Sequence, residues 1–145
     1  MKTLVVYDSV HGNTEKLAKA IGEAVTGGAE VLKAGSTDPK GLSDVGLLVM
    51  GCPTHGGRPS PAMKGFLDGV PDETLKGLRI AVFDTRFASR MTKIFGYAAD
   101  RASKALEAKG AVLVAPPEGF IVKGTEGPLK EGELERATAW AKKLA

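Results

Sequence analysis

The sequence has one cysteine, few aromatic residues and no long apolar run. A lone Cys52 cannot form a disulfide within the chain, which favours a reducing, cytoplasmic compartment. The longest apolar stretch, residues 45–52, is far shorter than the ~20 residues of a membrane-spanning helix, and residues 4–7 are too few for a secretory signal. Aromatic residues make up only 6% of the chain, which argues against a nucleic-acid interface built on base stacking. We therefore expect neither a membrane nor a nucleic acid as a partner.

The composition is that of a folded protein. Its 145 residues are 43% hydrophobic and 26% charged, which is typical of a globular protein, and the length fits one domain over residues 1–145. The net charge is +3, with the positive excess in the second half of the chain. This excess indicates either a docking face for an acidic partner or an ordinary solvated helix face.

Short apolar runs alternate with helical patterns along the chain. Apolar runs predict strands at residues 4–7, 29–32, 45–50, 78–83 and 111–115, with a continuation at 120–122 beyond Pro116 and Pro117. Helical spacing predicts helices over residues 13–25, 61–67, 89–109 and 133–144. This alternation predicts an α/β fold, a doubly wound parallel sheet of five strands with helices on both faces. Ligands in such sheets bind beyond the C-terminal ends of the strands, which directs attention to the loops after strands one, three and four.

The loop after the first strand leads directly into a helix. It consists of Ser9, Val10, His11, Gly12, Asn13 and Thr14. Hydroxyl and amide side chains beside a helix N-terminus favour an anion such as phosphate, because the helix dipole adds to the hydrogen bonds. The alternative is a plain helix cap made by Asn13 or Thr14. The loop is neither a Walker loop nor a dinucleotide fingerprint, since no Gly-Lys-Ser/Thr follows it and the chain has no G-x-G-x-x-G.

Two further loops carry polar residues. The loop after the third strand contains Pro53, Thr54, His55, Gly56, Gly57 and Arg58. Its adjacent glycines allow a planar ligand to approach the backbone closely, although an ordinary turn is the alternative. The loop after the fourth strand contains Asp84, Thr85, Arg86 and Phe87. Phe87 is the one aromatic residue of the three loops, and it either faces a ligand or folds back onto the core.

Together these loops resemble those of the flavodoxin family. Residues 9–14 resemble its phosphate signature, S/T-x-T-G-N-T, and residues 53–57 resemble its flavin-contacting loop. The resemblance spans the whole chain and implies a flavodoxin-like sheet, of strand order 2-1-3-4-5, that binds FMN. Residues 53–58 and 84–87 would flank the flavin ring. The phosphate ligands that the resemblance implies, besides backbone N–H groups, are Ser9, His11, Asn13 and Thr14.

Some positions depart from the family pattern. His11 stands where the signature has a threonine, so an imidazole replaces a hydroxyl. Asp8 adds a negative charge beside the expected dianion and must point away from it or be neutralised. The Trp and Tyr that usually enclose the ring are absent from these loops, which leaves His55 and Phe87 in that role. Flavodoxins are typically acidic, whereas this chain has a pI of 9.0, which favours an acidic redox partner.

The resemblance implies an electron carrier that shuttles electrons between redox proteins. FMN would perform the redox chemistry, and the protein would orient and tune it. We expect a peptide at Gly56-Gly57 to accept a hydrogen bond from the reduced flavin. We also expect Arg58 or Arg86 to stabilise the anionic reduced ring. For the assembly we expect a monomer or a weak homodimer.

Other functions remain open at this point. Cys52 and Arg58 form a Cys-x5-Arg pattern that resembles cysteine-dependent phosphatases, with Asp84 as the candidate acid, although an inert buried thiol is the commoner explanation. An FMN-dependent quinone reductase shares the flavin motifs, and a chain that has lost its flavin would only bind partners. A receiver-type phosphorylation switch is excluded, because Gly51 and Cys52 stand where it needs an aspartate. The histidines and the cysteine lack the spacing of a metal site.

Overall fold

The structure is a computed structural model that describes residues 2–54, 59–87, 97–124 and 127–144. The strands are β1 (Lys2–Tyr7), β2 (Glu30–Lys33), β3 (Val45–Pro53), β4 (Arg79–Phe87), β5 (Val112–Leu113) and β6 (Glu118–Val122). The helices are α1 (Asn13–Ala24), α2 (Pro61–Gly69), α3 (Asp72–Leu75), α5 (Ala98–Ala108) and α6 (Glu133–Lys142), with a short 3-10 helix, η1 (Ala34–Ser36).

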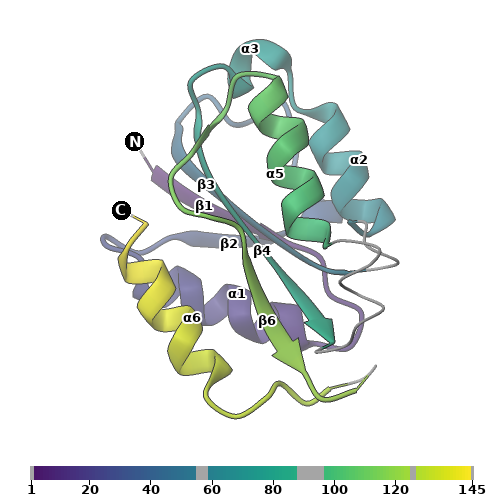
Figure 1. The fold of residues 1–145 in the computed structure, drawn as a ribbon. Coiled ribbons are helices and arrows are strands. Elements are labelled where there is room, and N and C mark those ends of the chain that lie inside the picture. The colour runs from purple at the N-terminus through teal and green to yellow at the C-terminus, as the bar shows by residue number, and fades with distance from the viewer. Residues whose placement is uncertain (1, 55–58, 88–96, 125–126, 145) are drawn as a thin grey trace.

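The strands form one parallel sheet in the order β2-β1-β3-β4-β5 (Figure 1). β1 lies between β2 and β3, and its Val5 is paired with Val31 on one side and with Val49 on the other. β5 pairs with the start of β4, and β6 pairs with the end of the same strand. The interval between β5 and β6 contains Pro116 and Pro117, which lack the N–H groups that a sheet ladder needs. The strand order 2-1-3-4-5 is therefore confirmed.

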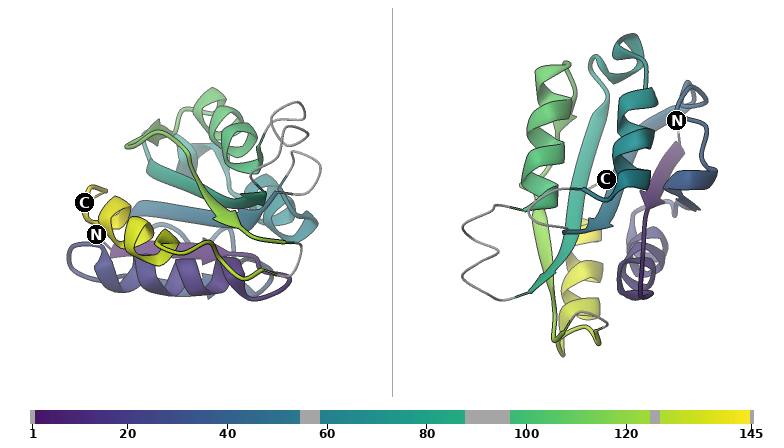
Figure 2. Two further views of the ribbon diagram at one scale, coloured as in Figure 1. Left: turned by 60° about the horizontal axis from the view of Figure 1, so that its bottom comes forward. Right: turned by 90° about the vertical axis from the view of Figure 1, so that its right-hand side faces the viewer.

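Helices cover both faces of the sheet. α1 and α6 lie on one face, and α2, α3 and α5 lie on the other (Figures 1 and 2). Successive residues of a strand point to opposite faces, so Val5 and Val49 pack with Leu17 of α1, whereas Val6 and Met50 belong to the core under the other helices. Burial on both faces is the physical reason why the central strands are continuous apolar runs.

Two strands extend further than the sequence predicted. β4 continues to Phe87, so residues 84–87 are strand residues and not a loop. The reason is β6, which supplies hydrogen-bond partners for this polar segment and pairs Asp84 with Gly119 and Arg86 with Ile121. β3 likewise continues to Pro53.

The helix predicted over residues 89–109 is described as α5, over Ala98–Ala108, while residues 88–96 lie outside the described part of the chain. α6 begins at Glu133 as expected and ends two residues early, at Lys142. In the described ranges, none of the helices has the length and apolar character needed to span a membrane.

Candidate functional site

The turn between β1 and α1 is closed by backbone geometry and one hydroxyl. Gly12 adopts a left-handed conformation with φ of 90°, which only glycine adopts without strain. Its N–H donates to Ser9 Oγ at 3.0 Å. Asp8 is tied to β3, because its N–H donates to the carbonyl of Gly51 at 3.0 Å. These bonds hold the turn at the C-terminal end of the sheet, directly before the first turn of α1.

The N-terminus of α1 has no side-chain cap from within the turn. Its N-cap residue is Gly12, which has no side chain, so the structure does not show the alternative, a plain cap made by Asn13 or Thr14. Both residues lie inside the first helical turn. The positive end of the helix dipole and the backbone N–H groups of that turn therefore face the loop, an arrangement that favours an anion.

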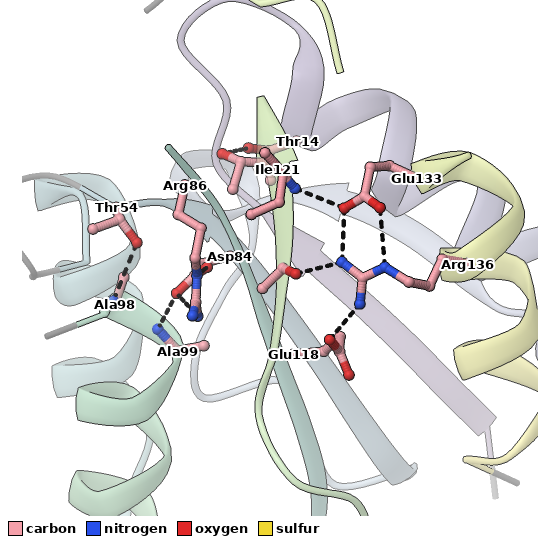
Figure 3. Close-up of polar contacts among 12 residues, drawn as sticks. Thr14, Thr54, Asp84, Arg86, Ala98, Ala99, Glu118, Ile121, Glu133 and Arg136 are labelled. Atoms are coloured by element: carbon pink, nitrogen blue, oxygen red, sulfur yellow. Dashed lines mark hydrogen bonds and ion pairs between the residues drawn. The ribbon is translucent and has the colours of Figure 1, made fainter. Parts of the chain in front are cut away.

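The side chains of the turn divide into exposed and buried ones. Val10 is 59% exposed, His11 is also exposed and Ser9 is half-buried. Thr14 is buried, and its hydroxyl is hydrogen-bonded to the hydroxyl of Thr85 in β4 at 3.1 Å (Figure 3). This bond joins the start of α1 to the end of β4. Ser9 and His11 are thus the more exposed polar side chains of the turn, whereas Asn13 and Thr14 are buried.

Thr54 connects β3, β4 and α5. Its N–H donates to the carbonyl of Thr85 at 2.9 Å, and its Oγ1 accepts the N–H of Ala98 at 3.2 Å (Figure 3). His55, Gly56, Gly57 and Arg58 lie outside the described residues, so the roles expected of them stay predictions.

Asp84 and Arg86 form a buried ion pair at the end of β4 (Figure 3). Arg86 Nε donates to Asp84 Oδ1 at 2.6 Å, and Nη2 donates to Oδ2 at 2.8 Å. The Asp84 side chain is fully buried, and its Oδ2 also accepts the N–H of Ala99 at 2.9 Å. Burial raises the pKa of Asp84, while the bonds from Arg86, from Ala99 and from Thr54 oppose that rise.

The guanidinium of Arg86 lies close to both Tyr97 and Gly119. Its Cζ lies 3.4 Å from the ring centroid of Tyr97, a cation–π contact. An ideal Cβ built on Gly119 would stand 2.2 Å from the same Cζ, so only glycine allows this approach. This corrects the expectation that Arg86 lends a net positive charge to a ring, since Asp84 balances that charge. Tyr97 lies ten residues after Phe87 in the sequence, and no local pattern predicted its contact with Arg86.

Phe87 is the last residue of β4, and its side chain lies outside what the structure describes. Pro53 is the last residue of β3 and is half-buried. In the sheet register Pro53 pairs with Thr85, so the ends of the two strands that we expected to flank a ring are adjacent.

Cys52 is not a nucleophile. Its side chain is buried among core residues and is only 2% exposed. Burial, followed by the charge of Asp84, raises its pKa to about 12. The thiol is therefore protonated at neutral pH, which removes the thiolate that a cysteine-dependent phosphatase requires. Among the described residues, no three His, Cys, Asp or Glu side chains are grouped so as to hold a metal ion.

The arrangement defines a doubly wound α/β protein with a glycine-capped turn between its first strand and first helix. The family model described as Flavodoxin matches residues 5–140, so the chain belongs to the flavodoxin family. A flavodoxin from Maridesulfovibrio salexigens is 29% identical to it over 120 residues, which cover 78% of this chain and 81% of that protein.

Solved structures agree on the fold. A flavodoxin from the domain Archaea superposes with a TM-score of 0.82 at 21% identity, covering 100% of this chain and 96% of the other. Oxidised flavodoxin 1 from Bacillus cereus gives a TM-score of 0.80 at 19% identity, covering 99% and 97%.

Flavodoxins bind FMN, and this chain is an FMN-binding electron-transfer protein of that family. One structural observation is consistent with the phosphate end of the cofactor lying at this turn. An ideal Cβ on Gly12 would meet no atom within 4 Å, so the space over the turn is open to a ligand.

Proposed function

We propose that the FMN phosphate binds at residues 9–14 and that the chain carries electrons between redox proteins. The observation that supports the phosphate site is the glycine-capped turn, in which Ser9 is bonded to the Gly12 N–H and the space beside Gly12 is open. Pro53 and Thr54, with residues 84–87, are proposed to flank the ring, together with the predicted contacts of residues 55–58.

When bound, FMN supplies the electron chemistry, and the residues of the chain bind and orient it. The Ser9 hydroxyl accepts the Gly12 N–H, which orients it so that its own proton can be donated to a phosphate oxygen. The exposed imidazole of His11 offers a second N–H donor. The dipole of α1 stabilises the charge of the phosphate.

On the ring side, buried contacts hold the ends of the strands. The Asp84 carboxylate joins Arg86 to the first turn of α5, and Thr54 joins β3 to the same turn. The Asp84 side chain is fully buried, so water does not compete for its bond with Ala99, whereas the bond between Thr54 and Ala98 is part-buried. They fix the positions from which the chain leaves β3 and β4.

We further propose a cytoplasmic protein, monomeric or weakly dimeric, whose partners are acidic. The single buried cysteine supports a reducing compartment, and the charge of +3 with a pI of 9.0 supports an acidic partner. Electron transfer from the reduced, FMN-loaded protein to an acidic iron–sulfur protein should slow as salt is added, because the attraction is screened. Faster transfer to a basic cytochrome would contradict this partner.

The phosphate site is tested by titrating the apoprotein with FMN and with riboflavin, which lacks the phosphate. Ser9→Ala is expected to weaken FMN binding about tenfold to a hundredfold, the effect of one hydrogen bond to a charged group. It should leave riboflavin binding unchanged. Ser43→Ala is the matched control, because Ser43 is exposed and precedes β3 at the opposite end of the sheet. A parent protein that binds FMN no more tightly than riboflavin would overturn the proposed phosphate site.

A further inference from the structure

The chain after β6 folds back as a hairpin. We define the C-terminal hairpin as residues 121–130, which the structure describes at 121–124 and 127–130. Val122 forms an antiparallel bridge with Leu129. The N–H of Lys123 donates to the carbonyl of Pro128 at 2.9 Å, and the N–H of Lys130 donates to the carbonyl of Ile121 at 2.8 Å. These bonds hold residues 121–123 against residues 128–130.

The base of the hairpin is anchored to α6. Glu133 Oε2 accepts a hydrogen bond from the N–H of Ile121 at 2.7 Å. Oε1 of the same carboxylate accepts a hydrogen bond from Nε of Arg136 at 3.0 Å (Figure 3). Arg136 also pairs with Glu118 and lies 4.5 Å from the ring centroid of Phe120. The hairpin is thus connected to both β6 and α6.

Gly127 of this hairpin lies against Asn13 at the start of α1. An ideal Cβ on Gly127 would stand 2.6 Å from Asn13 Nδ2, 2.7 Å from Oδ1 and 3.0 Å from Cγ. Real Cβ atoms essentially never come within 3.0 Å of another heavy atom in this way, so a side chain at position 127 forces the carboxamide to move. Asn13 is only 8% exposed, which shows how closely its surroundings cover it. Gly127 also has a φ of 99°, a conformation that favours glycine.

We propose that Gly127 is a positioning residue for the phosphate site. Its backbone holds the Asn13 carboxamide in place, so the C-terminal hairpin is a second structural support of the phosphate-binding turn. This inference rests on the proposed function, since it assigns Asn13 to the phosphate end of FMN. It adds a contact between residues 114 positions apart, which the phosphate signature itself does not contain.

The test is Gly127→Ala, with FMN and riboflavin titrated into the apoprotein. We expect FMN affinity to fall about tenfold or more, as for the loss of one hydrogen bond to a charged group, and riboflavin affinity to change less than about twofold. Gly132→Ala is the matched control. Gly132 has a similar φ of 86°, but an ideal Cβ there meets nothing within 4 Å. It imposes the same kind of backbone strain without displacing Asn13, so its ratio of FMN to riboflavin affinity should equal that of the parent.

A double variant tests the inference if Gly127→Ala alone does not fold. Asn13→Ala removes all three atoms that the new Cβ would meet, so Asn13→Ala/Gly127→Ala should fold. The urea midpoint of the double variant should exceed that of Gly127→Ala. Its ratio of FMN to riboflavin affinity should equal that of Asn13→Ala alone, because the effects of substitutions at two contacting residues are not additive.

Two outcomes would overturn the inference. One is a Gly127→Ala protein with the parent ratio of affinities; the other is an additive double variant. If the parent itself shows no preference for FMN over riboflavin, the proposed phosphate site fails first, and the inference fails with it.

Discussion

Replacing Arg86 by methionine tests the buried ion pair at the end of β4. The Asp84 side chain is fully buried, and that of Arg86 is only 14% exposed. Methionine keeps an apolar stem but removes the two hydrogen bonds to the carboxylate, at 2.6 and 2.8 Å. Removing one partner of a buried pair costs about 3–5 kcal/mol, because a buried charge is left uncompensated. We expect Arg86→Met to lower the free energy of unfolding at pH 8 by an amount in this range.

The loss should depend on pH, because Asp84 can take up a proton. Burial already raises the pKa of Asp84 in the presence of Arg86, and removing Arg86 raises it further. The stability that comes from this proton uptake is fully present below the pKa of Asp84 in the unfolded chain, about 3.9. It is lost as the pH rises through the higher pKa of Asp84 in the folded protein. The gap in unfolding free energy between variant and parent should therefore narrow as the pH is lowered from 8 toward 5.

Urea unfolding followed by the fluorescence of Trp140 measures this gap. Trp140 is the single tryptophan, and its ring packs edge-to-face against Phe83 and Phe120 with centroids 6.0 and 6.1 Å apart. The control, Asp84→Asn/Arg86→Met, leaves no carboxylate to titrate, so its gap should be smaller and independent of pH. A loss below about 1 kcal/mol for Arg86→Met, the range of an exposed pair, would refute the reasoning. A pH-independent gap in that single variant would refute it equally.

Two further predictions concern the core. With its pKa raised to about 12, the buried thiol of Cys52 should not react with an aromatic disulfide reagent at pH 8 until urea unfolds the protein, and rapid stoichiometric labelling of the native protein would contradict its burial. Gly51→Ala should lower the free energy of unfolding by about 1–3 kcal/mol, since a Cβ there would stand 2.0 Å from Cζ of the fully buried Phe83. Gly35→Ala, where a Cβ meets nothing within 4 Å, is the control, and equal losses would refute the packing argument.

Much of the fold follows from local patterns. The central strands must be apolar at consecutive positions, because helices cover both faces of the sheet, and this is what residues 4–7 and 45–50 displayed. The turn before α1 could also be predicted from the sequence, since a glycine before a helix that begins Asn-Thr is a local feature. The match of the flavodoxin family model to residues 5–140 confirms the family that these residues resemble.

The end of β4 was predicted wrongly for a physical reason. Residues 84–87 are polar and read as a loop, and they become a strand only because β6, more than thirty residues later, pairs with them. The same pairing brings Gly119 under Arg86 and so turns two charged residues into a buried ion pair. No local pattern distinguishes a charged pair in a loop from one in the interior.

The sequence alone therefore determined the order of strands and helices, the position of the glycine-containing turn before α1 and the family, because each depends on residues that are neighbours along the chain. Tertiary structure alone decided that Arg86 faces Asp84 and Tyr97, that Cys52 is inert, and that Gly127 lies against Asn13. These properties depend on burial and on contacts between distant segments, which are set when the sheet assembles and the helices pack upon it.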